Sequence, residues 1–312
     1  GFMGLYQRSG LQWLARKTKL LNVLPATLRQ MEKVLPTLPR LREMRRRPQR
    51  FLPMQQPKRR VAFFAGCLMD TMFKSTNDAT IQLLQMAGCE VVIPSSQTCC
   101  GALHGHGGEK EKAKMLAKRN IEAFEAVEAD VIVTNAGGCG AYLFEYDHLL
   151  QDDAEWAERA RQFASKVKDV SDVLVEMKFH EQSLKARPEI VTYQDSCHMR
   201  NVMKASRSPR LLLNSVEGVQ FREMNDADRC CGSAGIYNLV QPDMAIRILD
   251  HKMDYAKQTD ATTIVTSNPG CLLQMKLGIE RAGLSERVRA VHLVDFLLEV
   301  VKYQERGESD DE

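Results

Sequence analysis

Eight of the chain's cysteines form two quartets with nearly equal spacing, and this repeat constrains the fold more than any other feature. Within each quartet, 31 or 32 residues separate the first cysteine from an adjacent pair, and 38 or 39 more precede the last. The first quartet is Cys67, Cys99, Cys100 and Cys139, and the second quartet is Cys197, Cys230, Cys231 and Cys271. Both adjacent pairs are followed by glycine. Because the period is far longer than that of a solenoid repeat, we infer the duplication of a small domain.

Composition places the chain among globular proteins with room for two cores. It has 312 residues, of which 44% are hydrophobic and 27% charged. Nine cysteines in a chain of this size do not indicate a disulfide framework, which belongs to small secreted proteins. Cys89 lies outside the repeat, and we expect a buried apolar thiol there. The net charge of +3 is too small to indicate a nucleic-acid partner, and no apolar run has the length of a membrane helix.

Alternating strand and helix patterns predict an α/β fold with a parallel sheet in each half. Short apolar or β-branched runs end at or near the cysteine blocks, at 61–67, 90–96, 131–135, 190–197, 219–225 and 263–268. Helical patterns occupy 76–87, 109–128, 152–168, 242–258 and 272–282. Loops at the carboxyl ends of parallel strands meet at one edge of a sheet. We therefore expect each quartet to converge on one point.

This interpretation divides the chain into four parts. Residues 1–60 form a helical and basic linker segment, with nine Lys or Arg in residues 40–60. Two cysteine-rich domains follow, 61–185 and 186–304. Residues 305–312 form an acidic tail with the composition of a disordered segment. We interpret the basic stretch as a linker, with docking to anionic lipid or an acidic partner as the alternative.

Four thiolates can hold either an iron–sulfur cluster or zinc. Zinc sites usually take paired ligands from short Cys-x₂₋₄-Cys knuckles, and no such knuckle occurs in this chain. Ligands spread over three loops, with glycines beside them, favour a bulkier cluster whose sulfides accept backbone N–H groups. The spacing therefore favours one iron–sulfur cluster per half and leaves zinc open.

Several motifs also resemble a known family. The Cys-Cys-Gly blocks, with DSCHMRN (195–201) and CCGSAGIYN (230–238), resemble the cysteine-rich domains of heterodisulfide reductase and its relatives. The stretch GLYQRSGLQWLARKTKLLNVLP (4–25) is similar to the linker of the bacterial glycolate oxidase iron–sulfur subunit. The resemblance covers essentially the whole chain.

The resemblance implies an electron-transfer subunit that is inactive alone. Its expected partners are FAD-containing subunits that oxidise glycolate, a ferredoxin-like domain or chain, and a membrane acceptor such as quinone. The expected location is the cytoplasm, as a peripheral protein at the inner face of the membrane. Members of this branch carry an amino-terminal ferredoxin-like domain with Cys-x₂-Cys-x₂-Cys-x₃-Cys-Pro runs, and this chain has none.

A second departure concerns the cluster type. The heterodisulfide reductase pattern ends in Cys-x-x-Cys, and the missing partners fall at Ala136 and Asn268. Four thiolates per half suffice for an ordinary [4Fe–4S] cluster, while one half could hold zinc or nothing. Three alternatives to a glycolate complex stay open: disulfide reduction at a cluster, a lactate-oxidising complex and a zinc scaffold.

The histidines and Asp195 are weaker candidates. We expect His104 or His198 to lie near a cluster, whereas His106 is interpreted as an ordinary loop residue. The remaining histidines are expected on the surface or on helices, at positions 148, 180, 251 and 292. Asp195 is expected to have a structural role, such as capping a helix or accepting from a loop amide.

Overall fold

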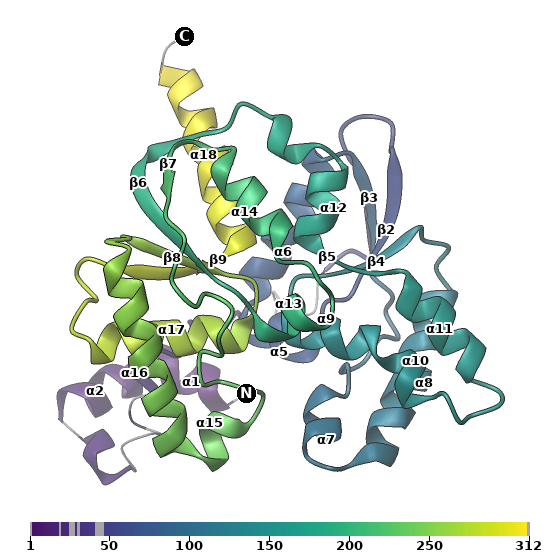
Figure 1. Cartoon of the computed structure of the whole chain (residues 1–312), viewed down its shortest axis with the longest axis horizontal. Helices are drawn as coiled ribbons and strands as arrows, with labels where there is room; N and C mark the ends of the chain where they lie inside the picture. The colour runs from purple at the N-terminus through teal and green to yellow at the C-terminus, as the bar shows by residue number, and fades with distance from the viewer. Residues whose placement is uncertain (1, 19, 25–28, 30–31, 41–46, 311–312) are drawn as a thin grey trace.

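The computed structural model describes residues 2–18, 20–24, 29, 32–40 and 47–310, and its strands form two sheets (Figure 1). The strand order is β1-β3-β2-β4-β5 in the first sheet and β7-β6-β8-β9 in the second. The first sheet contains β1 (Arg50–Phe51), β2 (Arg59–Phe63), β3 (Cys89–Val92), β4 (Val131–Thr134) and β5 (Val167–Asp169). The second contains β6 (Lys185–Gln194), β7 (Glu217–Phe221), β8 (Thr263–Thr266) and β9 (Arg289–His292).

The two sheets repeat one topology. Apart from β1, which pairs antiparallel with β3, all pairs are parallel. Each sheet then has its second strand at one edge, followed by the first, third and fourth. Strands β4 and β8 are buried at every position, which explains their unbroken Val, Ile and Thr runs. The predicted duplicated α/β architecture is confirmed.

Helices connect the strands in both halves. The first half contains α5 (Cys67–Met72), α6 (Lys74–Met86), α7 (Ala102–His106), α8 (Lys110–Glu125), α9 (Gly137–Phe144), α10 (Tyr146–Leu149), α11 (Ala157–Ser165) and α12 (Val170–Glu176). A short 3₁₀ turn, η2 (Phe179–Glu181), precedes β6. The second half contains α13 (Cys197–Asn201), α14 (Arg207–Asn214), α15 (Tyr237–Val240), α16 (Pro242–Gln258), α17 (Pro269–Arg281) and α18 (Leu293–Asp310).

One hydrophobic core is shared by the two halves. It joins Val61 and Phe63 of the first sheet to Val191 and Val265 of the second. Helices α6, α12, α14 and α18 supply the side chains between them, and α18 packs against both α6 and β6 (Figure 1). Alternate strand residues face two outer cores: Ala62 packs with α8 and α11, and Ile264 packs with α16 and α17. The halves are therefore held together by buried apolar side chains.

Several elements differ from the sequence prediction. Strands β5 and β9 were not predicted, because each has only three or four residues and runs directly into a helix. The helix predicted at 152–168 is shorter in the structure: α11 ends at Ser165, and β5 begins at Val167. Helix α18 also extends to Asp310 and so enters the acidic tail, where we expected disorder. Its apolar residues Leu297 and Val301 anchor it in the shared core.

The amino-terminal segment forms short helices, α1 (Phe2–Arg8) and α2 (Leu11–Lys17), and a 3₁₀ turn, η1 (Leu20–Val23). Buried Glu32 connects α1 and α2 by accepting hydrogen bonds from Tyr6, Gln12 and Arg16. Apolar side chains on these elements remain exposed: Leu5, Leu11, Trp13, Leu20 and Val23.

The basic stretch at 40–60 contacts the first half of the molecule. Arg47 forms ion pairs with Asp70 and Asp78, and Arg50 forms one with Glu90. Residues 41–46 of this stretch lie outside the described residues. Within the described part of the chain, no helix is both long enough and apolar enough to cross a membrane.

Candidate metal centre

The cysteine blocks follow the carboxyl ends of corresponding strands in the two halves. Cys67 begins α5 after β2, and Cys197 begins α13 after β6. The adjacent pairs lie between β3 and α7 and between β7 and α15. Cys139 and Cys271 lie in the first turns of α9 and α17, after β4 and β8. Each quartet is therefore collected at the edge of a parallel sheet where ligands commonly bind.

The thiols of the first quartet contact one another in a chain. The sulfur of Cys67 lies 3.4 Å from that of Cys99. The thiol of Cys100 interacts in turn with those of Cys99 and Cys139. The second quartet repeats this pattern, with contacts from Cys197 to Cys230, then to Cys231 and finally to Cys271. These contacts place four sulfurs per half within reach of one another.

Hydrogen bonds between neighbouring thiols shift the pKa values of several of them in opposite directions. Hydrogen bonds from Cys100 and Cys67 hold the pKa of Cys99 well below the usual range of a thiol. Hydrogen bonds from Cys197 and Cys231 lower the pKa of Cys230 in the same way. Hydrogen bonding to these thiolates raises the pKa of their neighbours, and burial adds to the rise. Four thiolates at such short distances would repel one another, so a cationic metal centre would be needed for all four thiols of a quartet to ionise together.

Both quartets line a single cavity of about 130 Å³. The halves meet beside it, where the Gly137 N–H donates to the Ser267 carbonyl at 3.0 Å. A Cβ at Gly137 would lie 2.5 Å from the Ser196 hydroxyl oxygen, so glycine permits this approach. The sequence predicted one convergence point per half, and the structure brings the two points together.

Two histidines line the same cavity, one from each half. His198 Nδ1 lies 3.7 Å from the sulfur of Cys197, and burial lowers the pKa of His198. The ring of His106 lies 5.7 Å from that of His198. The interpretation of His106 as an ordinary loop residue is therefore wrong, because α7 turns it toward the second half. His104 instead pairs with Glu109 at 2.7 Å.

Three other predicted residues, His292, Asp195 and Cys89, are buried in the structure. His292 was expected on the surface or on a helix, but it is buried in β9 and bonds the Asn135 carbonyl at 2.8 Å. Asp195 is buried and forms ion pairs with Arg200 and Arg210, instead of the helix cap or loop-amide bond that we expected. Cys89 is fully buried in β3, as predicted, and burial raises its pKa to about 11.

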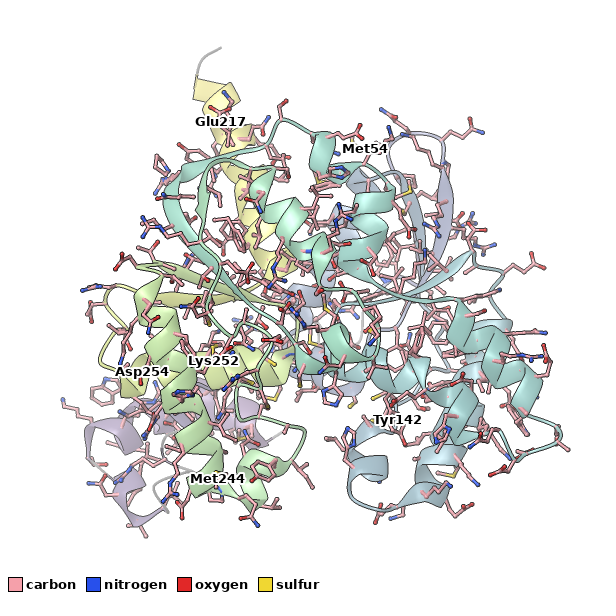
Figure 2. The ribbon with its side chains drawn as sticks, in the orientation of Figure 1. Met54, Tyr142, Glu217, Met244, Lys252 and Asp254 are labelled. Atoms are coloured by element: carbon pink, nitrogen blue, oxygen red, sulfur yellow. The ribbon has the colours of Figure 1, made fainter. Side chains whose placement is uncertain are left out.

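Polar side chains form hydrogen bonds with the backbone carbonyls of the first adjacent cysteine pair. Asn120 donates to the Cys99 carbonyl at 3.0 Å and accepts from the Thr98 N–H at 2.7 Å. Tyr146 donates to the Cys100 carbonyl at 2.7 Å. Sequence reasoning missed both residues, since a single Asn or Tyr carries no sign of a hydrogen-bond partner far away in the chain. In Figure 2, the labelled Tyr142 belongs to the first half and the labelled Lys252 to the second.

The only candidate metal ligands at this cavity that we consider are the eight cysteine thiols of the two quartets. Thiolates are the ligands of iron–sulfur clusters and of structural zinc. Among the described residues, no three His, Cys, Asp or Glu side chains are already arranged around the position of a single metal ion, since the sulfurs of each quartet contact one another, but the four thiols of each quartet match the ligand set of a cluster in type and number. What the structure offers is four sulfurs per half, around one shared cavity.

Comparison with known proteins identifies the class of this molecule. The family model for the cysteine-rich domain, CCG, matches residues 61–144 and 191–276. The chain is therefore a protein with two cysteine-rich CCG domains. A second model, for the linker region of the glycolate oxidase iron–sulfur subunit, matches residues 1–35. The chain belongs to the family of glycolate oxidase iron–sulfur subunits.

Individual relatives agree with this assignment. The chain is 62% identical to the probable glycolate oxidase iron–sulfur subunit of Bacillus subtilis (strain 168), over 97% of this chain and 68% of that protein. It is 33% identical to lactate utilization protein A of an Exiguobacterium strain, over 78% of this chain and 98% of that protein. A hypothetical protein from Helicobacter pylori has the same fold, with a TM-score of 0.57 at 10% identity, over 87% of this chain and 57% of that one.

Proposed function

We propose that this chain transfers electrons within a complex that oxidises glycolate, and that each quartet holds one iron–sulfur cluster. The observation that carries the proposal is the pair of thiol quartets, one per repeat, on one cavity. In this proposal Cys67, Cys99, Cys100 and Cys139 ligate the first cluster. Cys197, Cys230, Cys231 and Cys271 ligate the second. When bound, each cluster takes up and releases single electrons.

The chain's own side chains supply the rest of each site. Cys100, Cys231 and Cys271 are buried, so water has little access to that side of the quartets. Four thiolates match the ligand number of a [4Fe–4S] cluster. The heterodisulfide reductase pattern has a fifth cysteine in each domain. This chain has Ala136 and Asn268 at those two positions, and neither side chain can bind iron through sulfur. Zinc in one half is the alternative for this donor set.

The proposed partners are those of the family. FAD-containing subunits would oxidise the substrate, and electrons would pass through this chain and a ferredoxin-like domain or chain to a membrane acceptor such as quinone. The complex would lie at the inner face of the cytoplasmic membrane. Exposed Leu5, Trp13 and Val23 on the amino-terminal segment support contact with another protein surface. This chain alone would not oxidise glycolate.

A lactate-oxidising complex is the second candidate, and the 33% identity to lactate utilization protein A favours it. Glycolate is preferred because the identity to the glycolate oxidase subunit is nearly twice as high and the match includes the linker. Disulfide reduction at the cavity is a third candidate, which the paired histidines His106 and His198 would assist as proton carriers.

One experiment separates these proposals from a zinc scaffold. The chain is purified without oxygen and analysed for iron, acid-labile sulfide and zinc. We expect a brown protein with iron and sulfide in equal amounts and an EPR signal after reduction. A colourless, folded protein with about two zinc ions and no sulfide would overturn the electron-transfer proposal. A new paramagnetic species on adding a thiol to the oxidised protein would favour disulfide chemistry.

A further inference from the structure

Asn268 connects the two quartets. It stands at the amino-terminal cap of α17, three residues before Cys271. Its side-chain Nδ2 donates to the sulfur of Cys271 at 3.4 Å. Its Oδ1 accepts from the Gly138 N–H of the first half at 3.0 Å. One amide group therefore touches a thiol of the second quartet and the backbone beside Cys139 of the first.

The first half has no equivalent of this amide. Ala136 occupies the matching position, three residues before Cys139 and at the amino-terminal cap of α9. Both cap residues have extended backbone, with φ of −128° at Ala136 and −152° at Asn268. Because the backbones correspond, the difference lies in the side chain. A methyl group has no N–H to donate to sulfur.

Near the adjacent pairs, one backbone donor is matched between the halves, while Cys230 also accepts a hydrogen bond from the Ala234 backbone. The Gly232 N–H donates to the sulfur of Cys230 at 3.3 Å. The backbone of Gly101 donates to Cys99 in the corresponding place. Asn268 is thus a departure from the repeat at a ligand sulfur, and it is fixed in place by its second bond, to Gly138.

We propose that Asn268 tunes the second cluster, so that the second half holds an added electron more tightly than the first. The inference rests on the proposed presence of one cluster in each half. An N–H directed at a ligand sulfur stabilises the extra negative charge of a reduced cluster and raises its reduction potential. The bond to Gly138 keeps the amide oriented, with Nδ2 toward Cys271 rather than turned away.

The test is an anaerobic redox titration followed by EPR, on the full chain and on Asn268→Ala and Asn268→Asp. The second-half signal is the one missing from Cys231→Ser. We expect its midpoint potential to become more negative in both variants, and further in Asn268→Asp, whose carboxylate puts negative charge beside Cys271. The midpoint potential of the first-half signal should not change. Asn238→Ala is the control, since this half-buried Asn donates to the Gln274 amide and to no sulfur.

Each other outcome has a defined meaning. No iron or sulfide in the unaltered chain would contradict the proposed function itself. With iron and sulfide at the unaltered level, an unchanged second-half potential in both variants would overturn the role of Asn268. Equal shifts of both signals would overturn it too. If Asn268→Asp lost the second signal but kept the first, Asn268 would hold the cluster in place rather than tune it, and the proposal would fail.

Discussion

The hydroxyl of Tyr146 donates a hydrogen bond of 2.7 Å to the carbonyl oxygen of Cys100, and both residues are buried. The same hydroxyl accepts from the side-chain amide of Asn120 at 3.0 Å. Asn120 in turn bonds the carbonyl of Cys99. Two carbonyls of the first Cys-Cys-Gly block are therefore held by side chains from α8 and α10, and this block cannot shift without breaking buried hydrogen bonds.

Replacing Tyr146 by Phe should lower the free energy of unfolding by about 1–3 kcal/mol, because it leaves buried polar groups of Cys100 and Asn120 without a partner. Urea unfolding measures the change. Tyr142→Phe is the matched control, since the Tyr142 ring packs edge-on against Tyr146 but is less buried. Equal stability of Tyr146→Phe and the unaltered chain would show that the network contributes nothing.

Replacing Cys100 by Ser should remove about half of the visible absorption and half of the iron, since each quartet is proposed to hold its own cluster. Cys231→Ser should remove the other half. Cys89→Ala is the control, because Cys89 is buried in β3 and belongs to neither quartet. Unchanged spectra for both serine variants would contradict the ligand assignment, and complete loss from either one would indicate a single shared centre.

A side chain at Gly232 should be poorly tolerated. Its φ is +92°, and an added Cβ would lie 2.4 Å from the backbone oxygen of Ala245. Gly232→Ala should therefore cost several kcal/mol, from backbone strain and from the clash with α16. Gly108 has a φ of +83°, and a Cβ added there would have nothing within 4 Å, so Gly108→Ala isolates the backbone cost, about 1 kcal/mol. Thermal unfolding of both variants measures the difference in their stability losses. Equal melting temperatures would show that the backbone near Ala245 moves enough to remove the clash.

The repeat and the strand ends could be read from the sequence because they are local patterns. A β-branched run followed by cysteine marks the end of a strand whatever the packing of the two halves, as at Val131–Thr134 before Cys139. The meeting of the quartets could not be read in this way. It depends on the packing of α6 against α18, whose partners are more than 200 residues apart, as in the bond from Thr76 to Asp295. His106 was misjudged for the same reason, since its neighbour His198 lies in the other half.

The fully buried carboxyl of Asp169 should make stability depend on pH. Burial raises its pKa to about 7, and one of its oxygens has no hydrogen-bond partner among the described residues. The folded chain therefore keeps this proton up to about pH 7, whereas the unfolded chain loses it near the ordinary value of 3.8. Between these values the folded state binds more protons, so the group's contribution to stability falls as pH rises. From pH 5 to pH 8 the loss should be about 3 kcal/mol.

Asp169→Asn should abolish that part of the pH dependence. The Asn oxygen can still accept from the Ser171 N–H at the start of α12, while no proton is lost on raising the pH. Relative to the unaltered chain, the variant should therefore gain about 3 kcal/mol of unfolding free energy between pH 5 and pH 8. Exposed Asp152 provides the control, since Asp152→Asn should give a curve parallel to that of the unaltered chain. If the Asp169→Asn curve is also parallel, Asp169 is already ionised in the folded protein at pH 5 and its burial is offset by contacts that stabilise the charge.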